Sequence, residues 1–227
     1  MRSAHIAAVN GLKMYYEIHG SARPLVLIHG GGSTIQTTFG RILRDLARRH
    51  RVIAVEMQAH GHTRDIDRPL SFEQDADDVA ALLEQLHIDK ADFMGFSNGG
   101  TTCLQIAIRH PNRVRKLVVA AAMFKRDGLY PEFWESMRQA TLQSMPKELQ
   151  DAYRKVAPHP EQLPTFHDKC VKRMLEFKDW QAGEIQSIQA DTLIMIGDGD
   201  TSVPSTRWRC SGCCRMLSSR CFQARIT

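Results

Sequence analysis

A serine flanked by glycines is the part of this sequence best suited to covalent chemistry. Residues 95–99 read Gly-Phe-Ser-Asn-Gly, with Ser97 at the centre. The flanking residues predict a short strand before this turn and a helix after it. Gly95 and Gly99 let the backbone pass closely there, and the helix amides point toward negative charge that develops nearby. The context predicts a nucleophilic serine, although a strand-to-helix turn can also contain serine by chance.

A run of glycines could supply the second part of such a site. Residues 29–33 read His-Gly-Gly-Gly-Ser and follow the apolar segment 24–28. The transition state of acyl transfer carries an oxyanion that needs two backbone donors. We expect these donors to be the amides of Asn98 and Gly31, with Gly32 as the next candidate. His29, Gly30 and Gly32 would support the loop. The run does not match a dinucleotide or phosphate-binding fingerprint, and a flexible turn is the alternative interpretation.

Strands that alternate with helices must position these residues. A hairpin is predicted at 5–9 and 12–18 around Asn10-Gly11. Further strands are predicted at 24–28, 51–55, 91–94, 114–123 and 192–196. Helices are predicted at 38–49, 71–86 (with a capping box that begins at Ser71) and 99–109. This alternation predicts an α/β fold with a mostly parallel sheet and helices on both faces.

The segment between residues 123 and 192 is too long for a simple crossover between strands. It has helical character, and Pro131, Pro146 and Pro160 each stand at a possible helix start. We therefore expect residues 1–123 to form the first part of the core and residues 124–185 to form a helical cap. Residues 186–205 would return to the core, and residues 206–227 would be an aberrant, disordered tail.

Four segments, in this order and spacing, resemble the α/β-hydrolase superfamily. They are HGGGST, VEMQAHGHT, HIDKADFMGFSNGG and LIMIGDGDTSVP. The resemblance covers roughly residues 5–205 and is to the branch of small capped serine esterases and C–C hydrolases. It implies a catalytic acid after the strand that follows the cap, namely Asp200, with Asp198 as the alternative. An acid there holds the catalytic imidazole in the right tautomer, but Asp also favours turns.

The histidine that this resemblance implies is absent from its usual place. The family order is serine, acid, histidine, yet the last of the ten histidines in this sequence is His167. His29 and His62 follow sheet strands and could lie near the pocket. Neither stands where the family has its base, and we expect both to shape loops.

The composition changes at about residue 205. Residues 206–227 hold five arginines, no acid and four of the six cysteines. The tail thus carries the whole net charge of +5, and residues 1–205 are neutral. Read in a shifted frame, its codons permit an amphipathic helix, a strand and a Pro-Gly-x-x-His ending. We hypothesise a frameshifted tail, with the final helix and strand missing and the strand at 192–196 left as an exposed apolar edge. A zinc site at Cys210 and Cys213 is a less favoured interpretation.

The remaining composition limits the partners. Hydrophobic residues make up 43% and charged residues 24% of the chain, which is typical of a globular protein. We expect a cytoplasmic protein that binds neither nucleic acid nor membrane and that needs no metal or cofactor. The sequence gives no signal for the oligomeric state.

We expect a small-molecule ester as the partner of the site, with apolar contacts from the cap. The candidate pocket residues are Phe96, Trp134 and Met123, with Phe133, Met137 and Met145 from the cap; each could instead belong to the cap's own core. The predicted function is hydrolysis of a small carboxylic ester or related carbonyl compound through an acyl-enzyme. The alternatives are a catalytically dead pseudo-hydrolase that binds a ligand, or a lyase, thioesterase or perhydrolase on the same fold.

Overall fold

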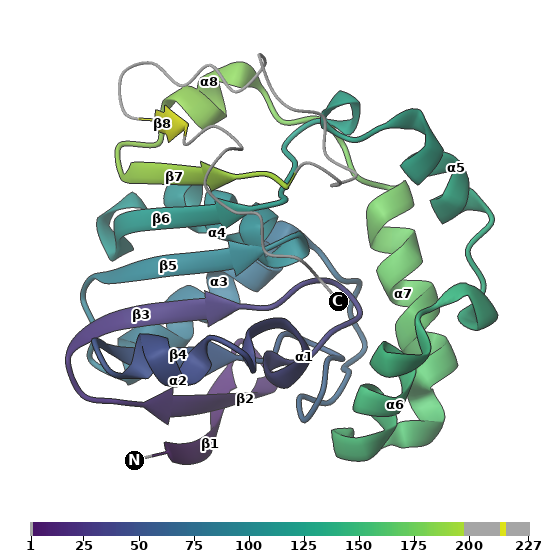
Figure 1. The fold of residues 1–227 in the computed structure, drawn as a ribbon, viewed down its shortest axis with the longest axis horizontal. Coiled ribbons are helices and arrows are strands. Elements are labelled where there is room, and N and C mark those ends of the chain that lie inside the picture. The colour runs from purple at the N-terminus through teal and green to yellow at the C-terminus, as the bar shows by residue number, and fades with distance from the viewer. Residues whose placement is uncertain (1, 198–213, 217–227) are drawn as a thin grey trace.

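One mostly parallel sheet forms the centre of the molecule (Figure 1). The computed structural model describes residues 2–197 and the backbone of 214–216. The strand order is β1-β2-β4-β3-β5-β6-β7-β8. β1 pairs antiparallel with β2 and β2 antiparallel with β4, whereas the pairs from β4 to β8 are parallel. The strands are β1 Arg2–Val9, β2 Leu12–His19, β3 Arg23–Ile28, β4 His50–Val55, β5 Ala91–Phe96, β6 Val114–Ala120, β7 Asp191–Met195 and β8 Cys214–Met216. The predicted α/β fold class is confirmed.

Helices cover both faces of the sheet. α3 and α4 lie on one face, and α1 and α2 lie on the other (Figure 1). The helices are α1 Ile35–Phe39, α2 Leu43–Ala47, α3 Phe72–Gln85, α4 Asn98–Arg109, α5 Pro131–Arg138, α6 Lys147–Val156, α7 Leu163–Leu175 and α8 Ala182–Gln186. Short 3-10 helices lie at Pro111–Arg113, Arg126–Gly128, Leu142–Ser144 and Pro160–Gln162.

Local sequence signals account for most of these boundaries. Asn10 and Gly11 both have positive φ, as a two-residue hairpin turn requires. The Ser71 side chain accepts a hydrogen bond from the Gln74 amide and caps α3. The predicted helix at 38–49 is wrong in its extent. The chain forms two short helices there, α1 ending at Phe39 and α2 beginning at Leu43, and between them Ile42 has a φ of −110° and a ψ of −13°, which depart from the α-helical values.

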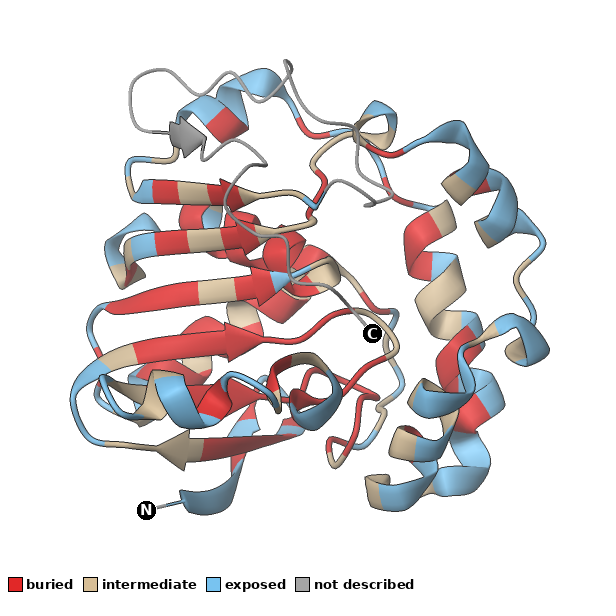
Figure 2. Ribbon diagram, viewed as in Figure 1, coloured by how far each residue is buried: buried red, intermediate tan, exposed pale blue. Residues whose placement is uncertain are grey.

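The cap lies beyond the carboxyl ends of the parallel strands. α5, α6 and α7 form a layer opposite the tips of β3, β5 and β6, and α8 returns to the sheet (Figure 1). Pro131 opens α5 and Pro146 is the N-cap of α6, as expected of proline at helix starts. The buried residues gather along the sheet and on the inner side of the cap (Figure 2). One apolar cluster joins the cap to the loop after β4, and its members are Ala59, Leu70, Tyr153, Leu163 and Phe166.

The edge of the sheet next to β7 differs from the sequence-based expectation. Thr192, Leu193 and Ile194 pair in parallel with Cys214, Arg215 and Met216. The expected uncovered edge is therefore wrong for these three residues, because backbone pairing needs only free amides and carbonyls and no apolar period in the sequence. The rest of 206–227 lies outside the described residues. Within the described part, no helix is long and apolar enough to cross a membrane.

Candidate active site

Ser97 occupies the turn between β5 and α4 in a rare backbone conformation. Its φ of 52° and ψ of −120° lie outside the regions that most residues adopt. The Ser97 amide donates to the Ala120 carbonyl at 2.8 Å, and its carbonyl accepts from the Thr101 amide at 3.0 Å. Such a conformation costs about 1–3 kcal/mol and persists only where its surroundings hold it. The hydrogen bonds to β6 and to the first turn of α4 do so here.

The glycines on either side of Ser97 allow three backbones to meet. A Cβ on Gly95 would collide with the Gly99 carbonyl, and one on Gly99 would collide with the carbonyls of Ile28 and His29. The start of α4 thus lies directly against the end of β3. This close approach is the physical reason for the glycines at 95 and 99.

The loop after β3 is held by its own polar groups. The Gly30 carbonyl accepts hydrogen bonds from the Ser33 amide (3.3 Å), the Ser33 hydroxyl (2.6 Å) and His29 Nδ1 (2.8 Å). His29 Nε2 accepts from the Met57 amide at 3.1 Å, which assigns the proton to Nδ1. Burial lowers the pKa of His29 and keeps its ring neutral. The structure thus places His29 within the loop framework and not beside Ser97.

Gly31 and Gly32 differ in what lies next to them. A Cβ on Gly31 would collide with the Asn98 side chain, so this glycine lies directly against the residue after Ser97. Gly32 has a φ of 72°, and its amide donates to His60 Nε2 at 3.3 Å. The amide of Gly32 is therefore engaged, whereas no described residue accepts a hydrogen bond from the amide of Gly31.

His60 joins three parts of the molecule and was not predicted from the sequence. Its Nδ1 donates to the Gln58 carbonyl at 2.8 Å, while Nε2 accepts from Gly32 and lies 3.8 Å from the Cys170 sulfur. Its ring packs edge-on against Phe166 of the cap, at 4.7 Å between centroids. Burial lowers the pKa of His60 well below its ordinary value, so the ring is neutral. The only sequence signal was its place between Ala59 and Gly61 after β4.

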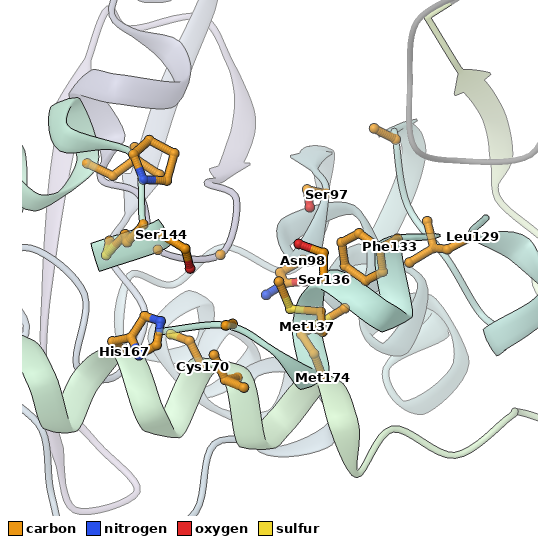
Figure 3. A pocket seen from close by; sticks show the side chains of 18 of the residues that line it. Ser97, Asn98, Leu129, Phe133, Ser136, Met137, Ser144, His167, Cys170 and Met174 are labelled. Atoms are coloured by element: carbon orange, nitrogen blue, oxygen red, sulfur yellow. The ribbon is translucent and has the colours of Figure 1, made fainter. Parts of the chain in front are cut away.

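A cavity of about 280 Å³ lies between Ser97 and the cap. Figure 3 shows Ser97 and Asn98 across from His167, Cys170 and Met174 of α7. Gly31, Gly32, Ser97, Asn98 and Thr101 form the core side of its wall. The predicted pocket residues that line it are Met123, Phe133, Met137 and Met145. These residues therefore face the site and are not only the cap's own core.

Two predicted pocket residues lie elsewhere. Trp134 is buried, donates from Nε1 to the Arg126 carbonyl at 2.8 Å and lies beneath the Arg126 guanidinium. A buried indole N–H needs a hydrogen-bond acceptor, and here the Arg126 carbonyl provides it. Trp134 therefore packs against the segment before α5 and does not line the cavity. Phe96 is 46% exposed and lies against Gly30. Phe96 is therefore not among the residues that line the cavity.

One face of α7 forms the opposite wall. His167, Cys170, Val171 and Met174 line the cavity, and their spacing of three and four residues places them on one side of the helix. The sequence did not indicate these residues, because such a spacing cannot show which face of a helix meets a pocket. His167 Nδ1 lies 3.0 Å from the Asp168 carboxylate.

Two ion pairs fix α7 to the core. Arg173 Nη1 and Asp75 Oδ2 are 2.9 Å apart, and both side chains are at most 4% exposed. Burial raises the pKa of Asp75 to about 6, although Arg173 acts in the opposite direction. Lys169 Nζ bonds the Asp65 carboxylate at 2.6 Å and the carbonyls of Ile66 and Arg68. These contacts set the distance between the cap and Ser97.

The remaining candidates are Asp198, Asp200 and His62. Asp198 and Asp200 lie outside the described residues. His62 Nδ1 bonds the buried Glu56 carboxylate at 2.8 Å and its ring stacks on Tyr15, so His62 does not line the cavity. Within residues 2–197, the His, Cys, Asp and Glu side chains form no cluster of three or more suited to a metal ion.

Comparison with known proteins places this site in a family. The family model described as "alpha/beta hydrolase fold" matches residues 23–163. A 2-hydroxymuconate semialdehyde hydrolase from Pseudomonas sp. (strain CF600) is 27% identical over 86% of this chain and 76% of its own length. Human Serine hydrolase BPHL is 30% identical over 87% of this chain and 70% of its own length.

Solved structures agree on the fold. The 2-hydroxy-6-oxo-6-phenylhexa-2,4-dienoate hydrolase from Rhodococcus sp. strain RHA1 superposes with a TM-score of 0.71 at 17% identity, over 90% of this chain and 83% of that one. The family match covers more than half of the chain, and it contains the loop after β3 and the turn at Ser97. The chain therefore belongs to the α/β-hydrolase family, as a serine hydrolase.

Proposed function

We propose that this chain is built to hydrolyse a small carboxylic ester through an acyl-enzyme on Ser97. The observation that carries the proposal is the direct contact between Gly31 and Asn98 beside Ser97, at the wall of an apolar cavity. An ester whose carbonyl carbon lies next to Ser97 Oγ would have its carbonyl oxygen between the two backbone amides.

The amide of Gly31, rather than that of Gly32, is the better candidate for the second oxyanion donor. The Gly32 amide donates to His60, so it is committed to another acceptor. The Gly31 amide has no such acceptor among the described residues, and its glycine touches Asn98. The helix dipole of α4 adds to the positive potential at the Asn98 amide.

In the proposed reaction, Ser97 Oγ attacks the ester carbonyl and forms a tetrahedral oxyanion. Collapse of this species releases the alcohol and leaves the acyl group on Ser97, and water then hydrolyses the acyl-enzyme. Asp200 is the proposed acid that would orient a base. No histidine follows His167 in the sequence. Without a base, turnover is expected to fall by roughly 10⁴ to 10⁶.

The lack of a histidine after His167 favours a second candidate function, namely a pseudo-hydrolase that binds its ligand without turnover. The names of two relatives, the 2-hydroxymuconate semialdehyde hydrolase and the 2-hydroxy-6-oxo-2,4-heptadienoate hydrolase, suggest cleavage of a carbon–carbon bond as a further possibility. A panel of p-nitrophenyl esters with increasing acyl length distinguishes ester hydrolysis from this alternative.

A fluorophosphonate probe tests the proposed nucleophile directly. We expect slow labelling at Ser97, located by mass spectrometry of the tryptic peptides and lost in Ser97→Ala. Ser136→Ala is a matched control, because Ser136 also lines the cavity but has no oxyanion donors assigned to it. Labelling that moves with Ser136 would refute the assignment, and no labelling at all would favour the pseudo-hydrolase.

A further inference from the structure

The wall of the cavity is free of formal charge wherever the structure describes it. No Lys, Arg, Asp or Glu is among its described lining residues. Most of the large lining side chains are apolar, and four of them are the methionines Met123, Met137, Met145 and Met174. Flexible methionines adapt to apolar groups of different shapes. The cavity wall is thus well suited to an uncharged group.

The cations of α7 all act elsewhere, although this helix forms one wall. Arg173 is buried against Asp75 on the core side. Lys169 is bound by Asp65 and by two backbone carbonyls, and Lys172 pairs with Glu176 on the outside of the helix. Helical geometry puts these three cations on a different side from Cys170 and Met174. None of them is free to meet a substrate anion in the cavity.

His167 is the one described lining residue with a basic side chain. Its Nδ1 lies 3.0 Å from the Asp168 carboxylate. The imidazole of His167 is therefore already paired with a carboxylate from its own helix. This leaves the described lining without a counter-ion for a carboxylate.

Resting on the function proposed above, we propose that the cavity selects neutral substrates: esters whose acyl group is uncharged and apolar, with no second carboxylate. A carboxylate that enters the cavity loses its hydration, and the described part of the wall offers no unpaired cation in return, only neutral donors such as the Ser136 hydroxyl and the Asn98 amide. For an apolar group of the same length, leaving water is favourable, and the group gains contact with the methionine-rich wall. This discrimination also argues against a dicarboxylate or keto-acid substrate for the same site.

A matched pair of ligands tests this selection without any turnover. Ethyl hexanoate and monoethyl adipate have acyl chains of equal length, and the second carries a carboxylate where the first has a methyl group. Binding is measured by calorimetry to Ser97→Ala at neutral pH, after its melting temperature has been compared with that of the unmodified chain. We expect ethyl hexanoate to bind at least about tenfold more tightly.

A charge placed in the wall should reverse the preference. Met137 is half-buried and lines the cavity from α5, so Met137→Lys has room to place its ammonium at the cavity. In the Ser97→Ala background this variant should bind monoethyl adipate at least about tenfold more tightly than before. Gln139→Lys is the matched control, because it adds the same charge to an exposed position at the end of α5, outside the lining. It should leave both affinities unchanged.

Three results would overturn the proposal. Monoethyl adipate could bind to Ser97→Ala as tightly as ethyl hexanoate, which would mean that the cavity has a cation from another part of the chain. A folded Met137→Lys could leave the preference unchanged. Ethyl hexanoate could fail to bind at millimolar concentration. None of these outcomes depends on catalysis. The proposed function fails if the fluorophosphonate probe does not label Ser97 or if the labelling is lost in Ser136→Ala, and that experiment reports on it separately.

Discussion

Ser97 has a positive φ that only its surroundings can maintain, and those surroundings are made of glycine. Gly95, Gly99 and Gly100 each lack room for a Cβ, and the obstructing atoms are mainly backbone carbonyls that cannot rotate away. The strain at Ser97 and the close approach of β3, β5 and α4 are thus two results of the same short segment.

A substitution at Gly99 should therefore act on both stability and chemistry. Gly99→Ala places a methyl group against the carbonyls of Ile28 and His29. We expect it to lower the free energy of unfolding by about 3 kcal/mol, as overpacking does, and to abolish labelling of Ser97. Unfolding in urea measures the first effect and the fluorophosphonate probe the second.

Gly183→Ala is the control for this prediction. Gly183 lies in α8, and a methyl group added there would have no other atom within 4 Å. Alanine there should raise the free energy of unfolding by up to about 1 kcal/mol, because alanine has the higher helix propensity. Equal effects of the two substitutions would show that the crowding at Gly99 has no energetic consequence.

At the scale of elements, the loop after β3 and the cap are connected through one imidazole. His60 accepts from the Gly32 amide, and its ring contacts Phe166 while its Nε2 lies near Cys170, both on α7. The hydrogen bond to His60 holds the Gly32 amide in one orientation. Because Gly31 directly precedes Gly32, this bond also restrains the backbone of Gly31, the proposed oxyanion donor. We expect His60 to be a positioning residue for the loop.

Two variants separate this positioning role from simple packing. His60→Gln retains an acceptor for the Gly32 amide, whereas His60→Phe keeps an aromatic ring without one. Hydrogen exchange at Gly32 should accelerate in His60→Phe and stay slow in His60→Gln, and Ser97 labelling should slow in the same order. In His60→Phe the hydrogen bond to the Gly32 amide is lost, and we expect the stability of the loop to fall by about 1 kcal/mol, the net contribution of one neutral hydrogen bond. Identical exchange in both variants would contradict the prediction.

The ion pair between α3 and α7 should matter for the placement of the cap. Removing one partner leaves the other charge buried, so Arg173→Met should lower the free energy of unfolding by about 3 kcal/mol. The double variant Asp75→Leu/Arg173→Met should lose much less than the two single losses added together. Urea unfolding of the four proteins in this cycle measures the coupling.

An exposed pair provides the comparison for that cycle. Lys147 and Asp151 lie one turn apart on the surface of α6 at 2.6 Å. Lys147→Met should change stability little, because water and salt screen exposed pairs. A loss as large as that of Arg173→Met would mean that burial does not determine the strength of these pairs.

At the scale of the whole molecule, two buried neutral histidines make the fold sensitive to acid. Burial lowers the pKa of His29 and of His60 below 6.5, so the unfolded chain takes up more protons than the folded one as the pH falls through that value. The stability from these groups is complete above pH 6.5 and is lost below it. Asp75 acts in the opposite sense, because its raised pKa of about 6 favours proton uptake by the folded state.

Comparison of the unmodified chain with His60→Gln isolates one of these contributions, because Asp75 is present in both. The free energy of unfolding should fall more steeply in the unmodified chain between about pH 7 and 5, by up to about 1.4 kcal/mol for each pH unit below 6.5. Chemical denaturation at several pH values gives both slopes. Parallel curves would show that His60 does not resist protonation in the folded state.

The tail also has a consequence for the whole molecule. We predict that the coding DNA beyond codon 205, read in the shifted frame, encodes an amphipathic helix, a strand and a histidine. A chain with that restored segment should turn over p-nitrophenyl esters at least about 10⁴-fold faster than the present one. Early stop codons in the shifted frame, or the absence of a histidine from it, would refute the hypothesis.

The sequence by itself determined the parts of this protein that depend on local patterns. The alternation of apolar strands and amphipathic helices predicted the α/β sheet, Asn10-Gly11 predicted the hairpin, and the glycines around Ser97 predicted the strained turn. Each of these depends on residues within a few positions of one another, where backbone sterics and side-chain period act directly.

Only the tertiary structure decided how these parts meet. The engagement of the Gly32 amide depends on His60, 28 residues further along the chain. The face of α7 that meets Ser97 depends on Arg173 pairing with Asp75, 98 residues away. Trp134 and Met137 belong to the same helix, yet only Met137 lines the cavity. Such choices follow from packing between distant segments, and a local pattern does not specify which of several apolar faces is buried against which partner.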